Sequence, residues 1–383
     1  MKILITTGIF EPEIGGPAKY TPKLAAKLVE RGHTVRVLTY SAQASYAFSS
    51  GGGSAFGGDA KYPFTVERVI RSNKFSNYIR FFRATYAAAR HADLIYSLDW
   101  FSAGLPVALA ARLLGKKYVV RVGGGYTWEK YLNDGNPPMT LRDFYAQGKH
   151  KRYPIMYRVM TFVFRGAERV VFNSEIQKEL YARYYDIAPS HLATIFNPIP
   201  RLQFPVLRRE PIKEIVFAGR MIVKNNIETL IRAFAASGLS DYTLTLIGDG
   251  FITEKMRTLV EDLGVRSVVF LPAMGQEELY ERIRNARYVI LPSWTDVSPN
   301  TACECLALGI PFLITSENYL SFRDQLPLVI DPRSVRDMAE KIRLLSDESV
   351  YAEYCEKLRA IQFKNDWDDV CTAHEKLFSS CLA

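Results

Sequence analysis

The feature that most constrains the fold is an alternation of short β-branched runs with helical patterns along all 383 residues. In the first half, such runs predict buried strands at 2–6, 34–39, 64–70, 93–96, 117–122 and 169–172. A second series predicts strands at 214–219, 243–248, 267–271, 288–291 and 311–315. Segments with helical spacing lie between them, such as 18–31 and 101–115. This order predicts parallel sheets with helices on both faces.

The two series predict two Rossmann-like domains, each long enough to bury its own core. The segment 196–205 carries three prolines between the series and is interpreted as an interdomain linker. We therefore expect an N-terminal domain over 1–198, a second domain over 199–365 and a terminal helix over 366–383.

The opening residues predict a buried strand and not a signal peptide, and no run approaches the roughly 20 apolar residues that cross a bilayer. The five cysteines all lie in the second half and contain no CxxC pair. That distribution favours reduced thiols over a disulfide framework or a zinc site. The expected location is the cytoplasm, and peripheral association with a membrane stays an alternative.

Charge is unevenly distributed. Residues 1–195 hold 27 Lys and Arg against 14 Asp and Glu, whereas the remainder holds 22 against 26. The basic half indicates either a solvated surface or an anionic partner: a membrane, a phosphorylated acceptor or nucleic acid. The segment 72–90 mixes aromatics with Arg80, Arg83 and Arg90. It fits a helix lying on an anionic membrane or a buried helix with a basic outer face.

The segment 291–315 carries the strongest functional signal. A strand ends at Leu291, Ser298-Pro299 predicts a helix start, and Gly309 with Pro311 predicts its end. Asp296 and Glu304 lie eight residues apart across this start. Free N–H groups at the helix N-terminus would seat a diphosphate at the carboxyl edge of the sheet.

This segment resembles the E-x7-E signature of the retaining glycosyltransferases of family four, with Asp296 and Glu304 at the acidic positions. The resemblance implies that Asp296 contacts the donor sugar and that Glu304 binds the nucleotide ribose. It assigns the backbone contacts to the donor to Ser298, Asn300 and Thr301. Aspartate is one methylene shorter than the usual glutamate. The alternative interpretation is that Asp296 is an exposed loop residue and Glu304 a helix residue in a solvent salt bridge.

The segment 215–234 resembles the family's Gly-Arg…Lys-Gly motif, which implies that Arg220 and Lys224 bind the diphosphate. Asn225-Asn226 stand where Lys-Gly is usual. Gly248, in the Gly-Asp-Gly turn after the next strand, is expected to line the nucleotide pocket. The segment 10–39 resembles the family's opening, which implies that Gly15 and Gly16 approach the donor phosphates.

The family's usual histidine is replaced by Gly123. A histidine base is therefore not expected, and the leaving phosphate itself would take the acceptor's proton. Asp99 and Glu129 are the remaining polar candidates, either for orienting the acceptor, for proton transfer or for structuring a loop.

The resemblance implies a GT-B fold, with two Rossmann-like domains whose parallel sheets face across a cleft and a terminal helix that returns to the first domain. The expected activity is metal-independent, retaining hexosyl transfer from a nucleotide-diphosphate sugar to a glycan, lipid-linked or small-molecule acceptor. No metal or cofactor is expected. The alternatives are a catalytically degenerate or epimerase-like GT-B protein and a basic nucleic-acid-binding protein, although no nucleic-acid motif is present.

Overall fold

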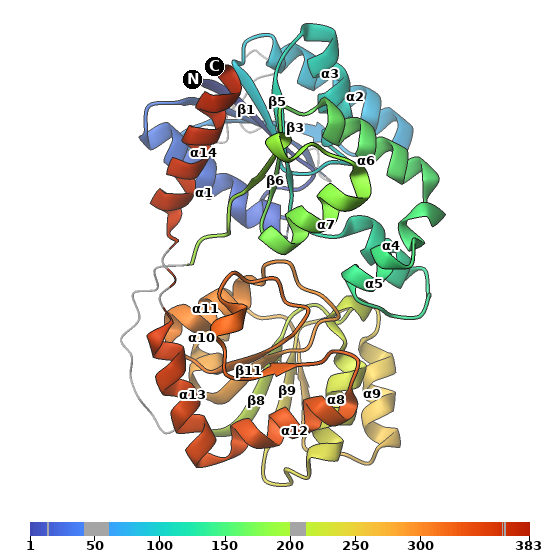
Figure 1. Ribbon diagram of the computed structural model, residues 1–383, viewed down its shortest axis with the longest axis vertical. Coiled ribbons are helices and arrows are strands. Elements are labelled where there is room, and N and C mark those ends of the chain that lie inside the picture. Colours follow the sequence, from blue (N-terminus) through green and yellow to red (C-terminus); the bar gives the residue numbers. More distant parts are fainter. Residues whose placement is uncertain (14, 42–60, 200–211, 362, 364) are drawn as a thin grey trace. The chain divides into compact units, whose positions relative to one another are not determined.

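The computed structural model describes residues 1–13, 15–41, 61–199, 212–361, 363 and 365–383. Most of the predicted linker, from residue 200 onward, lies outside the described residues. The chain forms two compact units, each built around one sheet (Figure 1). Unit 1 comprises Met1–Gly124, His150–Pro198 and Asn365–Ala383, and unit 2 comprises Gly125–Lys149 and Ile199–Lys364.

The sheet of unit 1 is parallel and has the order β3-β2-β1-β4-β5-β6-β7. Its strands are β1 (Lys2–Thr7), β2 (Thr34–Ser41), β3 (Thr65–Ile70), β4 (Leu94–Ser97), β5 (Tyr118–Val122), β6 (Arg169–Phe172) and β7 (Leu192–Thr194). The central strands are buried on both faces, which explains why their sequences are largely apolar, with Ser97 at the end of β4 and Arg121 within β5 as the buried exceptions.

Helices cover both faces of this sheet. They are α1 (Gly16–Glu30), α2 (Lys74–Ala89), α3 (Gly104–Leu114), α6 (Pro154–Gly166), α7 (Glu175–Tyr185) and α14 (Trp367–Leu382). α1 packs beside α14, while α2, α3 and α6 lie side by side on the other face (Figure 1). This division agrees with right-handed crossovers that reverse direction at β1.

The terminal helix α14 has a capped start and bonds to the segment after α1 near the middle of its length. Asp366 starts it with a capping box, because its side chain accepts from the Asp369 N–H and the Asp369 carboxylate accepts from the Asp366 N–H. Farther along, Glu375 accepts from Arg31 at 2.7 Å and lies 2.8 Å from the His33 ring.

The sheet of unit 2 is also parallel and has the order β10-β9-β8-β11-β12-β13. Its strands are β8 (Ile212–Ala218), β9 (Thr243–Ile247), β10 (Val268–Leu271), β11 (Ala286–Leu291), β12 (Phe312–Thr315) and β13 (Val329–Ile330). Its helices are α8 (Ile227–Ser237), α9 (Thr253–Asp262), α10 (Gln276–Asn285), α11 (Asn300–Leu308), α12 (Val335–Ser346) and α13 (Glu348–Ala360). Two short helices from the first half, α4 (Tyr126–Asn133) and α5 (Leu141–Ala146), also belong to unit 2.

The two parallel α/β sheets confirm the predicted fold class. The sequence patterns missed β7 and β13, which have only three and two residues. α11 begins at Asn300, with Pro299 as its N-cap and no capping side chain, so the predicted start at Ser298-Pro299 was early by about a residue. Gly309 ends the helix as predicted, with φ 69°. In the described part of the chain, no helix is both long and apolar enough to cross a membrane.

Candidate donor site at the carboxyl edge of the unit 2 sheet

The loop between β8 and α8 carries two of the predicted basic residues. Arg220 follows the end of β8 and is exposed, and within the described chain its guanidinium forms no salt bridge or side-chain hydrogen bond. Lys224 lies in a short 3-10 turn, Val223–Asn225. The carbonyl of Lys224 accepts from the Trp294 N–H at 2.9 Å, which ties this loop to the segment after β11.

Asn226 explains the departure from the usual Lys-Gly pair. Its φ is 56°, in the left-handed region that glycine and asparagine adopt most readily. The buried Asn226 amide donates to the carbonyls of Pro292 at 3.1 Å and Pro332 at 2.8 Å, and its oxygen accepts from Thr229 at 2.7 Å. Asparagine therefore keeps the backbone conformation of glycine and in addition joins three segments around the loop.

The predicted glycine turn lies directly against this loop. Gly248 has φ 123°, and a Cβ atom there would lie 2.2 Å from the Gly219 carbonyl oxygen. At Gly250 a Cβ atom would lie 2.1 Å from the Met221 oxygen. The glycines are required because two backbone segments meet at the ends of β8 and β9. The predicted contact between Gly248 and the nucleotide stays a prediction.

Asp296 lies in the loop between β11 and α11. Its backbone N–H donates to the Glu317 carbonyl at 3.2 Å, and its carbonyl accepts from the Tyr319 N–H at 2.8 Å. Its half-buried carboxylate accepts from the backbone N–H of Ser298. Burial raises the pKa of the Asp296 carboxyl above its usual range, although Lys224 and the Ser298 N–H stabilise the charged form.

Lys224 connects Asp296 with a third charged residue, Glu129 of α4. The Lys224 Nζ lies 3.3 Å from the Glu129 Oε1, and about a quarter of each side chain or less is exposed (21% and 27%). Burial favours a lower pKa for Lys224, but the carboxylates of Glu129 and Asp296 outweigh it and hold the pKa above its usual value. Arg220 adds an unfavourable positive potential. The lysine is therefore a fixed, charged group.

The N-terminus of α11 follows Asp296 and presents the first turn, which contains Asn300 and Thr301. Glu304 lies one turn farther along and is half-buried. Its Oε1 accepts from the Gln276 Nε2 of α10 at 3.4 Å. Tyr280 lies on α10 near Gln276. Burial, and then the charge of the neighbouring Glu304, raise the pKa of its hydroxyl. The Glu304 side chain on α11 thus contacts α10.

The segment 125–149 is fixed to unit 2 by contacts that no local pattern indicates. Besides the Glu129 pair, Arg333 donates to the Asp143 carboxylate at 2.7 Å, and the Leu141 N–H donates to the Thr295 hydroxyl at 2.9 Å. The last bond is buried. Sequence reasoning selected Glu129 but missed Thr295 and Arg333, whose partners lie more than 150 residues away in the chain.

Apart from Glu129, the predicted site residues of the first half lie in unit 1. Gly15 and Gly16 start α1, and Gly16 has open space around its Cα. Asp99 structures a loop: its carboxylate accepts from the N–H groups of Phe101 and Ala103, both at 2.9 Å, and from the Ser102 hydroxyl at 2.8 Å. Gly123, at the end of β5, is exposed.

Comparison with known proteins decides the family. The Glycosyl transferase 4-like domain matches residues 15–198, and the Glycosyl transferases group 1 domain matches residues 212–348. This chain is a group 1 glycosyltransferase. The predicted family resemblance is therefore confirmed.

Curated relatives include the D-inositol 3-phosphate glycosyltransferases of Saccharomonospora viridis (29% identical over 38% of this chain) and Pseudarthrobacter chlorophenolicus (29% identical over 52%). The chain aligns with only 39% and 52% of the lengths of these two relatives. Among solved structures, sucrose-phosphate synthase from Thermosynechococcus elongatus superposes with a TM-score of 0.75 at 17% identity, covering 99% of this chain and 98% of the other. That superposition establishes the GT-B fold of the glycosyltransferase.

Proposed function

We propose that this glycosyltransferase moves a hexosyl group from a nucleotide-diphosphate sugar to a hydroxyl of a glycan, lipid-linked or small-molecule acceptor. The proposed reaction retains the anomeric configuration and needs no metal. One observation carries the proposal: Arg220, Lys224, Asp296 and the N-terminus of α11 all follow strands at the carboxyl edge of one parallel sheet. Open α/β sheets bind ligands at this edge.

The proposed diphosphate site combines three sources of positive potential. The Arg220 guanidinium is exposed and suited to two parallel hydrogen bonds with phosphate oxygens. The Lys224 ammonium is held in its charged form by Glu129 and Asp296. The backbone N–H groups of Asn300 and Thr301 in the first turn of α11, together with the Ser298 backbone, complete the site. In unit 1, the start of α1 at Gly15 and Gly16 is the proposed further contributor.

The two carboxylates have separate proposed roles. Asp296 would accept hydrogen bonds from hydroxyls of the donor sugar. Because its side chain is one methylene shorter than the usual glutamate, it would reach fewer of these hydroxyls. Glu304 would accept from the ribose hydroxyls of the nucleotide. Gly248 would allow the nucleotide to approach the backbone closely.

In the proposed reaction, the bond between the sugar C1 and the leaving phosphate oxygen breaks as the acceptor oxygen bonds to C1 from the same face. The acceptor proton passes to the leaving phosphate oxygen. Negative charge grows on the diphosphate, and Arg220 and Lys224 stabilise it. Glu129 positions Lys224, because its carboxylate pairs with the Lys224 ammonium. Asp99 organises the loop that follows β4, because its carboxylate already accepts hydrogen bonds from that loop.

The test measures the thermal unfolding of the protein with UDP, GDP, ADP or CMP added, in the presence of a metal chelator. The increase in stability reports the binding of each nucleotide. A nucleotide present at ~100 times its dissociation constant should add about 2.7 kcal/mol of stability. We expect one nucleotide to stabilise the wild type and the exposed control Glu277→Ala, and to lose affinity with Glu304→Ala and Arg220→Ala. Equal affinity in all four proteins would refute the assignment of the site.

A further inference from the structure

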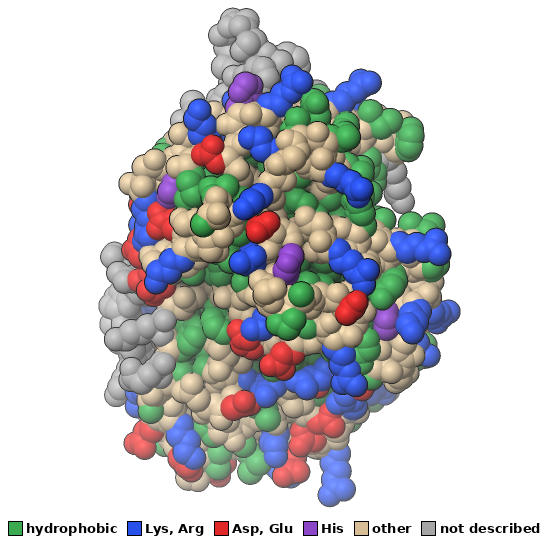
Figure 2. Space-filling view, turned by 45° about the horizontal axis from the view of Figure 1, so that its top comes forward, with side chains coloured by type: hydrophobic (Ala, Val, Ile, Leu, Met, Phe, Trp, Pro, Cys, Tyr) green, Lys and Arg blue, Asp and Glu red, His purple; other side chains and the backbone are tan. Residues whose placement is uncertain are grey.

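Three of the exposed large hydrophobic residues in the described chain are aromatic: Phe75, Tyr126 and Phe251. On the face shown in Figure 2, hydrophobic side chains lie in small groups between Lys and Arg side chains, so exposure alone does not mark a binding site. The position of Tyr126 is more informative. It lies on α4, the helix of unit 2 that contacts the 3-10 turn carrying Lys224.

Helix α4 exposes Tyr126 while its other side is buried. Tyr126 begins the helix and Glu129 lies three residues later, so the two side chains share one face. Thr127 and Trp128, which lie between them in the sequence, are buried, and the Trp128 indole donates to the Met139 carbonyl at 2.8 Å. Tyr126, in contrast, is 49% exposed. The helix is therefore held on one side and presents the Tyr126 ring to solvent on the other.

Glu129 places this face of α4 beside the candidate donor site. Its Oε1 lies 3.3 Å from the Lys224 Nζ, and the Lys224 charge also interacts with the Asp296 carboxylate. Tyr126 precedes Glu129 by nearly one helical turn, which corresponds to about 4.5 Å along the helix axis. That rise is comparable to the width of one sugar ring. An acceptor ring next to a donor sugar at Asp296 would therefore come within reach of Tyr126.

Tyr126 and the candidate donor site belong to the same compact unit. Although Tyr126 comes from the first half of the sequence, residues 125–149 are part of unit 2. The Leu141 N–H of this segment donates to the Thr295 hydroxyl at 2.9 Å, and Thr295 immediately precedes Asp296. The segment that carries the ring is therefore anchored to the loop that carries the proposed sugar-binding carboxylate.

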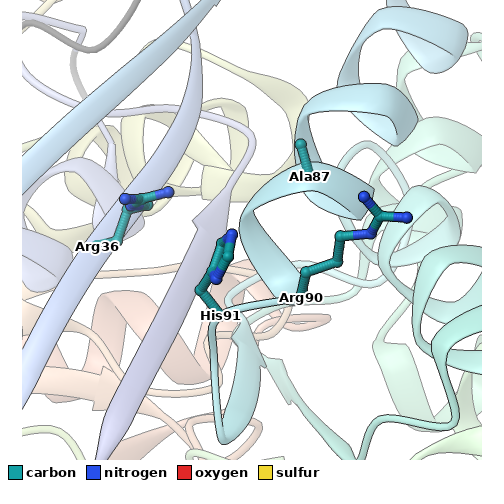
Figure 3. Close-up of a pocket in the computed structure, with 4 residues that line it drawn as sticks. All are labelled: Arg36, Ala87, Arg90 and His91. Carbon is teal, nitrogen blue, oxygen red and sulfur yellow. The ribbon is translucent and has the colours of Figure 1, made fainter.

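A pocket of about 330 Å³ in unit 1 is less suited to an acceptor. Its lining residues are Arg36, Ala87, Arg90 and His91 (Figure 3). They lie near the start of β2 and the end of α2, at the amino edge of the sheet, whereas open α/β sheets bind ligands at the carboxyl edge. Arg36 is paired with Glu67 at 3.3 Å, and Arg90 lies over the Tyr86 ring. Both guanidinium groups are thus already engaged within the protein.

We propose that the Tyr126 ring is a stacking platform for the acceptor, and that the acceptor is a carbohydrate whose pyranose ring packs against it. This proposal rests on the donor site proposed above. One face of a pyranose carries C–H groups that pack on an aromatic ring, while its hydroxyls remain at the edge for hydrogen bonds. The face of an aromatic ring carries negative potential, so it disfavours a phosphate group in the same place.

A nucleotide base also stacks on aromatic rings, so the donor is the competing occupant. Glu304, the proposed ribose partner, contacts Gln276 of α10. Tyr126 is connected instead through Glu129 to Lys224. The ring is therefore assigned to the acceptor and not to the base.

Saturation-transfer difference NMR with the methyl α-glycosides of glucose, galactose and mannose tests the proposal, with and without UDP, GDP, ADP and CMP. We expect at least one of these pyranosides to bind the wild type, with the largest transfer to protons of its C–H face. Tyr126→Ala should bind it about fivefold or more weakly, the scale of an aromatic stacking contact. Tyr126→Phe keeps the ring and should bind like the wild type. The matched control Phe75→Ala removes an exposed aromatic ring from unit 1 and should also bind like the wild type.

Thermal unfolding of the same variants with the nucleotides separates this proposal from the donor site and verifies that each variant is folded. Tyr126→Ala should keep the stabilisation by nucleotide. No stabilisation in any of the proteins would refute the donor site, and the pyranoside comparison would still decide whether Tyr126 binds a sugar ring. Four results would overturn the proposal: no pyranoside binding by the wild type, equal binding by Tyr126→Ala, an equal loss in Tyr126→Phe or Phe75→Ala, or a loss in Tyr126→Ala of nucleotide stabilisation alone.

Discussion

Replacement of Asn226 by aspartate should loosen the loop that carries Lys224. Aspartate has nearly the same shape as asparagine and also tolerates a φ of 56°. Its carboxylate can still accept from Thr229, but it cannot donate to the carbonyls of Pro292 and Pro332. The substitution therefore removes two buried hydrogen bonds without removing a side chain.

The expected cost follows from those two carbonyls. Each buried acceptor left without its donor costs about 1–3 kcal/mol, so the variant should lose about 2–6 kcal/mol. That is a large share of the free energy of unfolding of a typical protein, which is about 5–15 kcal/mol. Asn226→Gly keeps the backbone conformation and leaves room for water to reach the carbonyls, so its loss should be smaller, roughly 2 kcal/mol.

Urea unfolding measured by tryptophan fluorescence provides the assay. In a Trp100→Phe, Trp367→Phe background, the remaining tryptophans, Trp128 and Trp294, both report on unit 2. The surface control Asn285→Asp should change the free energy of unfolding by less than about 1 kcal/mol. A loss below about 0.5 kcal/mol for Asn226→Asp would show that these hydrogen bonds do not hold the loop.

Three further predictions concern other contacts. Gly248→Ala should destabilise unit 2 by at least about 1 kcal/mol in thermal unfolding, because alanine disfavours positive φ and its Cβ would meet the Gly219 oxygen; no change would contradict the close backbone contact. Burial opposes a charged Glu375, but His33 and Arg31 lower its pKa below the usual 4.5. Glu375→Gln should therefore destabilise the protein above pH 4.5, and the difference should vanish as acid protonates the wild-type carboxylate; a pH-independent difference would refute this. Arg333→Ala should speed hydrogen exchange in 125–149, and unchanged exchange would exclude Arg333 as its anchor.

The sequence predicted most of the fold because each strand and helix has a local signature. Buried parallel strands are largely apolar, β-branched runs, and the α11 segment has a strand before it and Gly309 after it. β7 and β13 escaped prediction because runs of two or three residues carry no periodicity.

The candidate site was only partly predictable. The positions of Arg220, Lys224, Asp296 and Glu304 were selected from their order along the chain. The role of Asn226 required its backbone angle and its partners, and the pairing of Glu129 with Lys224 required a contact between residues 95 positions apart. Local patterns do not contain such distant contacts, so the attachment of segment 125–149 to unit 2 emerged only from the structure.

The most direct test of the central claim is hydrogen exchange of the wild type with and without the stabilising nucleoside diphosphate, in a metal chelator. The proposed donor site predicts slower exchange in 219–226 and 296–304, with little change in α12 and α13. Protection confined to unit 1, or protection that requires added metal, would contradict the assignment of a metal-independent donor site to unit 2.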